Sequence, residues 1–471
     1  MHLNCDNMSV NVRVFLKTIL QFRYVCRRQT ATIVHCELCI TTKGRRITKM
    51  ATKPIIAEIG QLYREDTLAY QKKRYKRVID LYKNSFSSDG ADIRLFSAPG
   101  RAEIGGNHTD HNCGKVLAAS VDLDIVAVVE PTDEPFAVIR SEGHDEARIN
   151  ITELDVREEE KLTATGILRG ITRGFRDRGL AVGGFNAYTV SNVAKGSGLS
   201  SSAAFEVLIA TIYSYLFNGG CVDRIKLAQI GQFAENKFFG KNGGLMDQTA
   251  ASVGGFVAID FKDIDSPIIE NIGVDFESFG HALCIIDTNS HSGDRITEYA
   301  AILEEMHQIA DYFSVNSLRQ IVKQDIILNI NILREKFGDR AVLRAIHFFE
   351  ENKRVDKLVN ALKRNDFQAF LASINESGNS SYKYLQNVYS SNDVTHQGLS
   401  IGLNIAEYAL DRKGASRVHG GGFSGGIQAF VPFELLKLFK MELEKVFGNG
   451  SCHVLKIRQI GGCEIDKSSI E

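Results

Sequence analysis

The 471-residue sequence has little of what marks membrane proteins or nucleic-acid-binding proteins. No apolar stretch approaches the roughly 18 residues that a membrane-spanning helix needs. The formal net charge is −1, with 56 Lys or Arg against 57 Asp or Glu, so there is no basic excess to favour a nucleic-acid partner. We therefore expect a cytoplasmic protein with neither a membrane nor a nucleic acid as its partner.

Cysteines are too few and too irregularly spaced for a disulfide framework. There are nine, an odd number, and most stand alone, as reduced thiols do. Cys36 and Cys39 form one C-x-x-C pair, but no second ligand pair follows at the spacing of an ordinary zinc site. A disulfide framework is therefore not expected, and a metal site at this pair is disfavoured.

The common nucleotide-binding motifs are also missing. A P-loop requires Ser or Thr after its Gly-Lys pair, and the pairs that begin at Gly114 and Gly240 are followed by Val116 and Asn242. No G-x-G-x-x-G fingerprint opens a βαβ unit. If the protein binds a nucleotide, a different loop must hold the phosphates.

The first 49 residues differ in composition from the rest. They hold nine Lys or Arg against two Asp or Glu. Three interpretations compete: an organelle-targeting segment, a disordered basic tail, or an over-long gene model whose true start is Met50. We favour the third, and we expect residues 1–49 to be a disordered extension or not part of the native protein.

Apolar periodicity predicts helices and strands mixed along the rest of the chain. A helical pattern begins at 55–63 and continues through 75–82, a glycine-rich turn is expected at 98–106, and interspersed aspartates divide 116–129 into strand, turn and strand. Further helices are predicted at 203–216, 226–239, 433–446 and through most of 297–395, and further strands at 93–96, 185–193, 255–260, 282–287, 416–419, 427–431 and 452–457. Without regular βαβ alternation, this mixture favours an α+β fold.

The strongest local signal is the glycine- and serine-rich segment 194–204, which precedes an apolar helix. Its glycines allow a sharp turn in which several N–H groups face one concavity. A helix N-terminus adds unpaired N–H groups and the positive end of the dipole. The segment is a candidate phosphate loop, and the alternative is a plain serine N-cap.

Segment 97–111 gathers Arg101, Asn107, His108, Thr109 and Asp110 within a few residues. So many hydrogen-bonding side chains suit a ligand that carries several hydroxyl groups. A polar surface loop is the plain alternative. A metal site is disfavoured, because neighbouring residues on one turn rarely converge on a single ion.

Two further segments complete the candidate set. Asp247 follows a double-glycine turn and is a candidate base, and Glu235, on the preceding predicted helix, is a candidate Mg²⁺ ligand. Each acid could instead be a solvated surface charge. The glycines of 418–426 would allow backbone to approach a ligand or another strand closely, although such a run is more often a tight loop.

These four segments, in this order, resemble the GHMP kinase superfamily and, at 97–111 and 244–248, its galactokinase branch. The resemblance covers about residues 90–460. It implies a two-domain α+β fold with the active site in the cleft between the domains. An N-terminal mixed α/β domain would span 50–280, and a C-terminal ferredoxin-like domain with extra helices would span 281–471.

The resemblance also implies a role for each matching residue. Asp247 would be the catalytic base and Arg101 the residue that keeps it ionised. Mg²⁺, the expected cofactor, would bind Ser202 and Glu235. Sugar hydroxyls would contact Asn107, His108, Thr109, Asp110 and Tyr299, and the ATP phosphates would contact Gly196, Ser197, Gly198, Leu199, Ser200, Ser201 and Ser202. We expect a monomer whose partners are galactose, or a related sugar, and ATP.

Four positions depart from the family pattern. Glu103 and Asn107 stand where the family usually has Asn and Glu, so an exchanged carboxylate–amide contact is expected between them. His111 replaces a Tyr, and Ala194 replaces a Pro. Because an amide offers a donor that a carboxylate lacks, galactose recognition at Asn107 could differ from that of the family.

Three functions therefore remain open. The first is transfer of the ATP γ-phosphate to the C1 hydroxyl of galactose. The second is the same reaction on N-acetylgalactosamine or galacturonate. The third is a sensor that binds sugar and ATP without catalysis, which the complete Ser200–Ala203 motif disfavours. Mevalonate and homoserine kinases are disfavoured by segment 100–110.

Overall fold

The computed structural model describes residues 54–193, 198–241, 243–264, 266–289, 295–423 and 425–471. Residues 51–471 form one compact unit, and the basic extension at 1–49 lies outside the described residues. Within the described ranges, every helix is too short or too polar to cross a lipid bilayer.

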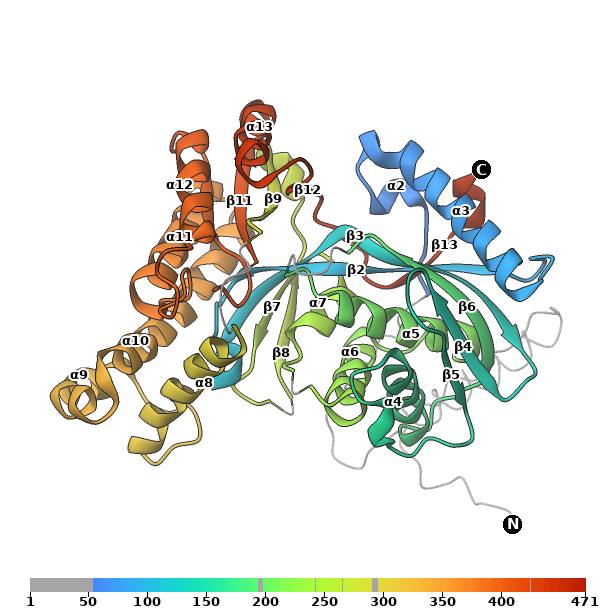
Figure 1. Cartoon of the computed structure of the whole chain (residues 1–471), viewed down its shortest axis with the longest axis horizontal. Helices are drawn as coiled ribbons and strands as arrows, with labels where there is room; N and C mark the ends of the chain where they lie inside the picture. The colour runs from blue at the N-terminus through green and yellow to red at the C-terminus, as the bar shows by residue number, and fades with distance from the viewer. Residues whose placement is uncertain (1–53, 194–197, 242, 265, 290–294, 424) are drawn as a thin grey trace, which may run out of the picture. The chain divides into compact units, whose positions relative to one another are not determined.

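A large, mostly antiparallel sheet occupies the middle of this unit (Figure 1). Its main path runs β1-β13-β2-β3-β6-β4-β5, and β7 and β8 extend it from β3. Two pairs, β1–β13 and β4–β6, are parallel. The strand bounds are β1 Ile56–Ala57, β2 Arg94–Gly105, β3 Lys115–Thr132, β4 Phe136–Ser141, β5 Ala147–Asn150, β6 Gly184–Ser191, β7 Phe256–Asp260, β8 Ile268–Ile272 and β13 Cys463–Ile465.

The predicted turn within 116–129 is wrong, because β3 runs unbroken from Lys115 to Thr132. The aspartates that suggested a turn are buried and bonded. Asp122 accepts the Lys456 N–H at 2.9 Å, and Asp124 accepts a hydrogen bond from Arg74 at 2.7 Å. β3 pairs with β7 along its first part and with β6 along its second, so the strand continues through the position of the predicted turn.

The predicted glycine-rich turn at 98–106 is also largely strand. β2 continues through it to Gly105, with shifts in register between Pro99 and Arg101 and between Glu103 and Gly105. Such irregularities bend a strand and redirect its side chains. The signature therefore begins inside the sheet, and only its second half is a loop.

A second sheet has four antiparallel strands in the order β10-β11-β9-β12. They are β9 His281–Asp287, β10 Ala415–Val418, β11 Gly426–Pro432 and β12 Cys452–Leu455. Numbered along the chain, this is the 4-1-3-2 order of a ferredoxin-like sheet, so the α+β prediction is confirmed. The division at 280/281 stays a prediction, and the chain returns to the large sheet at β13, which pairs with β2.

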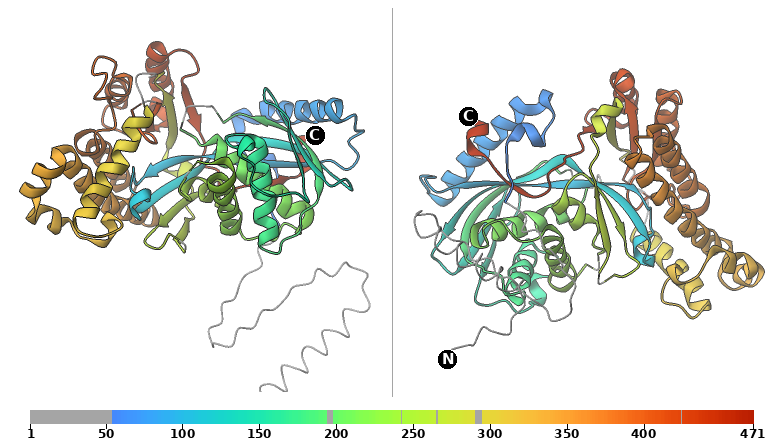
Figure 2. Two further views of the ribbon diagram at one scale, coloured as in Figure 1. Left: turned by 60° about the horizontal axis from the view of Figure 1, so that its bottom comes forward. Right: turned by 180° about the vertical axis from the view of Figure 1, so that it is seen from behind.

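The helices are grouped by the sheet that they cover (Figures 1 and 2). Helices α4 to α7 lie on one face of the large sheet, and α3 lies on the other. Helices α11 to α13 pack on the second sheet, while α8 and α9 pack against the long α10. The bounds are α2 Ile59–Leu62, α3 Leu68–Phe86, α4 Ala164–Asp177, α5 Ser201–Phe217, α6 Arg224–Ala234, α7 Met246–Val253, α8 Arg295–Tyr312, α9 Lys323–Leu328, α10 Ile330–Lys363, α11 Phe367–Ser380, α12 Gly398–Leu410 and α13 Leu436–Phe447.

The predicted helical pattern over 55–82 is broken at its start. Ile56 pairs with Glu464 of β13, so this part of the pattern is a short strand, and the long helix begins only at Leu68. Three apolar side chains of α3, Tyr75, Val78 and Tyr82, then pack on the outer face of the large sheet. This second core makes the sheet a buried central layer that can hold charged side chains away from water.

Candidate active site

An ion pair joins two of the candidate segments. Asp247 lies in the first turn of α7, and Arg101 projects from the irregular part of β2. The guanidinium holds both carboxylate oxygens, with Nε donating to Oδ1 at 2.7 Å and Nη2 donating to Oδ2 at 2.8 Å. Residues 146 positions apart are thus fixed in a fork geometry that specifies the direction of the carboxylate as well as its charge.

The environment keeps this carboxylate ionised. Burial opposes the charged form, but the neighbouring charge of Arg101, its hydrogen bonds and a hydrogen bond from Ser200 lower the pKa of Asp247 below its usual value. About a quarter of the Asp247 side chain remains exposed. The site therefore presents an anionic oxygen atom at a surface that a ligand can reach.

The serine-rich loop lies directly against this pair. Ser200 is the N-cap of α5, and its hydroxyl donates to Asp247 Oδ2 at 2.6 Å. Arg101 also reaches the loop, through Nη1 to the Gly198 carbonyl and through its backbone N–H to the Leu199 carbonyl at 3.0 Å. Ser201 and Ser202 form the first turn of α5, whereas Gly196 and Ser197 lie outside the described residues.

Two histidines and a tyrosine form an adjacent wall. His108 Nε2 lies 2.9 Å from the Gly421 carbonyl, and His108 Nδ1 lies 3.1 Å from His111 Nε2. Burial lowers the pKa of both rings, to about 3 and about 4, so both are neutral at pH 7. The Tyr299 ring, from α8, lies 4.9 Å from the His108 ring, and 45% of Tyr299 is exposed.

Gly421 belongs to the glycine motif and also contacts this wall. A Cβ atom at Gly421 would lie 2.8 Å from the Tyr299 ring, so a larger residue would displace that ring. On the opposite side, a Cβ atom at Gly244 would lie 3.1 Å from Asp110 Oδ2. The glycines of two segments thus allow the signature loop to meet both α8 and the Asp247 turn.

Asn107 is fully buried, and its amide is saturated within the protein. Its nitrogen donates to Glu103 Oε1 at 3.0 Å and to the Gly420 carbonyl at 2.7 Å, which confirms the expected carboxylate–amide contact with Glu103. Its oxygen accepts from Asn387 at 2.9 Å and from Ser381 at 3.3 Å. With two donors and two acceptor positions all used, the amide has none left for a ligand.

Thr109 is likewise turned into the protein. It is fully buried, and its hydroxyl lies 2.8 Å from the Gly106 carbonyl and 2.6 Å from the Lys115 carbonyl. Of the predicted sugar contacts, Asp110 and Tyr299 therefore have exposed side-chain surface, and His108 contacts Tyr299. Asn107 and Thr109 instead hold the loop in shape.

Glu235 lies behind the Asp247 turn, where α6 ends in a π-helical turn. Its Oε1 accepts from the Lys241 ammonium at 3.0 Å, and its Oε2 accepts from Gln248 Nε2 at 3.0 Å. The same Gln248 nitrogen donates to Glu206 Oε2 at 2.8 Å. Gln248 therefore links Glu235 to a second buried carboxylate and directly follows Asp247 in the chain.

Two family models match the segments that carry this geometry. The galactokinase galactose-binding signature matches residues 80–131, which include Arg101 and the His108 loop. The N-terminal domain of GHMP kinases matches residues 166–255, which include the α5 cap and Asp247.

Curated relatives extend the likeness over most of the chain. A galactokinase from Lactobacillus helveticus is 28% identical over 384 residues, which are 79% of this chain and 94% of the relative. A galactokinase from Thermotoga neapolitana is 30% identical over 353 residues, which are 74% of this chain and 93% of the relative. The chain belongs to the galactokinase family. The fold agrees, because the structure of Lactococcus lactis galactokinase complexed with galactose matches with a TM-score of 0.68 at 21% identity, over 83% of this chain and 99% of that one.

Sequence reasoning missed two residues that hold this site together. Gln248 was not singled out as a site residue, although its amide joins Glu235 to Glu206. Arg417, which donates to Glu103 Oε1 at 3.0 Å, precedes the glycine motif and was not considered. Its position next to 418–426 is the one sequence signal that could have drawn attention to it.

Proposed function

We propose that this chain is an ATP-dependent galactokinase that transfers the γ-phosphate of ATP to the C1 hydroxyl of galactose. The observation that carries the proposal is the Arg101–Asp247–Ser200 cluster, in which an ionised carboxylate is fixed beside the N-terminus of α5. Membership of the galactokinase family supports the sugar and the nucleotide.

In the proposed reaction Asp247 orients the C1 hydroxyl and accepts its proton while the hydroxyl oxygen attacks the γ-phosphorus of ATP. The bond from that phosphorus to the bridging oxygen breaks, and ADP leaves. Phosphoryl transfer needs little covalent help from a protein, so positioning and charge neutralisation supply most of the rate. Arg101 keeps Asp247 ionised before the reaction and offsets negative charge as it develops on the transferred group. Asp110 and Tyr299 are proposed to contact sugar hydroxyls, with His108 supporting the Tyr299 ring.

The ATP phosphates are proposed to bind the loop from Gly196 to Ser202 at the N-terminus of α5. Ser202 and Glu235 are proposed to hold Mg²⁺, and a hydroxyl with a carboxylate is a donor set that suits this ion. The Lys241 ammonium lies 3.0 Å from Glu235 Oε1, and a carboxylate that already pairs with a cation supports this proposal. Bound with ATP, Mg²⁺ would neutralise charge on the phosphate oxygens.

The decisive test is ADP release by the purified full chain with galactose, ATP and Mg²⁺, compared with Asp247→Asn. We expect wild-type turnover and a loss of about 10²–10⁴-fold in the variant, the usual range for general-base help. ATP binding, followed by calorimetry, should remain. No ADP release by the wild type, or more than a tenth of the rate in Asp247→Asn, would contradict the proposal.

A second candidate function is phosphorylation of a galactose derivative. It is favoured by the saturated amide of Asn107, which leaves a position of the family signature without a free ligand contact. A panel of galactose, N-acetylgalactosamine, galacturonate, glucose and arabinose separates the two functions. The highest kcat/KM on galactose supports the first, and the highest value on a derivative supports the second.

The same assay distinguishes an enzyme from a sensor that binds sugar and ATP without turnover. We expect turnover, because Arg101, Asp247 and Ser200 are all present and bonded to one another. The monomeric state and the cytoplasmic location stay predictions.

A further inference from the structure

The loop between β2 and β3 carries two of the proposed sugar contacts, His108 and Asp110. Bonds within the loop give it its shape: the hydroxyl and the N–H of Thr109 bond the Gly106 carbonyl at 2.8 and 3.2 Å. Such local bonds do not fix how far the loop lies from Asp247, which belongs to α7. That distance must be set by contacts between the loop and other elements.

Helix α10, which packs beside β2 and β3, bonds the backbone of this loop at both ends (Figures 1 and 2). The three pairs are His347 Nε2 with the Asn107 carbonyl at 3.0 Å, Glu351 Oε1 with the Gly106 N–H at 3.1 Å, and Asn352 Oδ1 with the Lys115 N–H at 2.6 Å. Positions 347 and 351 are four residues apart, so their side chains share one face of the helix. A single helix therefore holds the start of the loop and the point where β3 begins.

The hydrogen bonds of His347 have a fixed direction. A carbonyl oxygen can only accept, so Nε2 carries the ring proton and donates it to the Asn107 carbonyl. Nδ1 then accepts from the Ser380 hydroxyl at 2.9 Å. Burial lowers the pKa of His347 to about 4, so the ring is neutral at pH 7 and keeps this arrangement.

Glu351 is an ionised acceptor for the loop. Burial opposes its charge, but Arg354, whose Nη1 donates to Oε2 at 2.7 Å, and other neighbouring groups lower the pKa of Glu351 to about 2. Oε1, which accepts the Gly106 N–H, also accepts from the Ser377 hydroxyl at 2.6 Å. A hydrogen bond to a charged acceptor is stronger than one to a neutral acceptor, so this end of the loop is firmly held.

The same helix also holds α8, which carries Tyr299. Arg344 of α10 donates to Glu305 Oε2 at 2.8 Å, and Arg340 donates to Glu305 Oε1 at 2.9 Å. Glu305 lies on α8, six residues after Tyr299. One helix thus supports both sides of the proposed sugar site, the loop with His108 and the helix with Tyr299.

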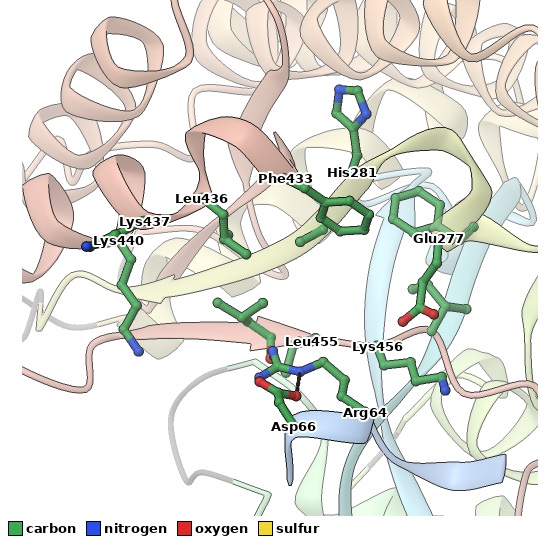
Figure 3. A pocket seen from close by; sticks show the side chains of 14 residues that line it. Arg64, Asp66, Glu277, His281, Phe433, Leu436, Lys437, Lys440, Leu455 and Lys456 are labelled. Atoms are coloured by element: carbon green, nitrogen blue, oxygen red, sulfur yellow. Dashed lines mark hydrogen bonds and ion pairs between the residues drawn. The ribbon is translucent and has the colours of Figure 1, made fainter. Parts of the chain in front are cut away.

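The α10 side chains that hold the loop act through its backbone. His347 and Glu351 are fully buried, and Asn352 is almost completely buried, so a ligand does not reach them. A cavity of about 480 Å³ is lined instead by residues from 64–66, 276–282, 433–440 and 454–457, none of them in α10 or the loop (Figure 3).

We propose that His347, Glu351 and Asn352 are positioning residues for the sugar. By holding the backbone of the loop, they fix the distance between residues 108–110 and Asp247. The inference rests on the proposed function, because a sugar has to contact both parts at once when its C1 hydroxyl meets Asp247. A misplacement of about 1 Å in such an arrangement can cost about 10²-fold in rate.

The test is His347→Leu, which removes the donor to the Asn107 carbonyl. With the sugar of the panel that gives the highest kcat/KM, ADP release should show a sugar KM raised at least tenfold. The KM for ATP should stay within twofold, because the ATP loop is held by Arg101 and α5. A purely structural role would lower the amount of active enzyme, and therefore kcat, and would leave both KM values unchanged. His347→Gln should restore the sugar KM to within threefold, because its amide can donate to the same carbonyl.

The matched control is Leu362→Ala, which opens the core at a buried residue of the same helix, about four turns after His347. Both variants should lower the urea midpoint of unfolding, but Leu362→Ala should leave both KM values unchanged. If His347→Leu does not fold, Asn352→Ala decides the question at the other end of the loop, where the sugar KM should rise at least threefold.

The outcomes separate this inference from the proposed function. An unchanged sugar KM in a folded loop-contact variant, or equal changes of sugar KM in His347→Leu and Leu362→Ala, would overturn the inference alone. No ADP release by the wild type with any sugar of the panel would overturn the proposed function, and this inference with it.

Discussion

Asp124, in the middle of the large sheet, and Asp247, at the candidate active site, have the same kinds of partner. Asp247 accepts from Arg101 and Ser200. Asp124 accepts from Ser97 and from two arginines, Arg74 at 2.7 Å and Arg458 at 3.1 Å. Burial disfavours the ionised form of each carboxyl group, but the neighbouring cations hold the pKa of each below its usual value.

The two sites differ in how completely the carboxylate is enclosed. Asp124 is fully buried, and a fourth donor, the Tyr63 hydroxyl at 2.5 Å, completes its shell. Asp247 keeps about a quarter of its side chain exposed and has no second arginine among its described partners. The same chemical group thus stabilises the fold where its shell is closed and can act on a ligand where the shell is left open.

The largest difference between the two sites is expected in stability. Asp124→Asn leaves two buried arginines without a counter-charge, so the free energy of unfolding should fall by about 3–5 kcal/mol. Asp247→Asn should cost at least about 2 kcal/mol less, because its site is partly solvated. Urea unfolding of both variants measures this. An equal loss of unfolding free energy in the two variants would show that the exposure of the carboxylate does not distinguish the two sites.

The serines offer a finer comparison. Ser97→Ala removes a hydroxyl that bonds Asp124 and also accepts from Arg458 at 2.6 Å, so stability should fall by about 1–3 kcal/mol with little change in kcat. Ser200→Ala should lower kcat about tenfold, the effect of about 1.4 kcal/mol at a charged acceptor, and change stability by less than 1 kcal/mol. ADP release and urea unfolding on the same samples give both values. If the two variants lost the same amounts of kcat and of stability, the distinction between a structural role for Asp124 and a catalytic role for Asp247 would be contradicted.

The smallest effect concerns Asp122, two residues before Asp124 on β3. No arginine among the described residues lies at hydrogen-bond distance from Asp122, and burial raises its pKa to about 6. A carboxyl whose pKa is raised by folding contributes stability below its unfolded pKa of about 3.9 and loses that contribution as pH rises through about 6. Relative to the wild type, Asp122→Asn should therefore be more stable at pH 7 than at pH 5, by about 1 kcal/mol.

Urea unfolding of Asp122→Asn and wild type at pH 5 and pH 7 measures this difference. The opposite sign is expected at Asp124, whose lowered pKa contributes stability above about pH 3.9 that is lost as pH falls further. A pH-independent difference for Asp122→Asn would show that the carboxyl titrates normally in the folded chain.

Local patterns in the sequence were sufficient for most helices and for the candidate site segments. Helix α5 lies within one or two residues of its predicted bounds, because its apolar run and serine cap are local signals. The contact between Glu103 and Asn107 was also predictable, since the two residues are four positions apart. The resemblance to the family was enough to assign Arg101 and Asp247 to one site.

The failures have a common physical cause. Asp122 and Asp124 suggested a turn, because an aspartate inside a strand is unfavourable unless something distant compensates its charge. Those partners are 50 residues away at Arg74 and 334 residues away at both Lys456 and Arg458. Single-sequence patterns carry no information over such separations, and the saturated amide of Asn107 depends in the same way on Asn387 and Gly420.

The partners of Asp124 also have a consequence for synthesis of the chain. Arg458 is followed within a few residues by β13, which pairs with β2 on one side and with β1 on the other. A ribosome-bound chain that ends before this point has one of the two cations that Asp124 needs and an unpaired strand edge. The large sheet should therefore reach its final stability only after nearly the whole polypeptide has emerged. Until then its early strands can pair with one another, but the sheet lacks its last strand.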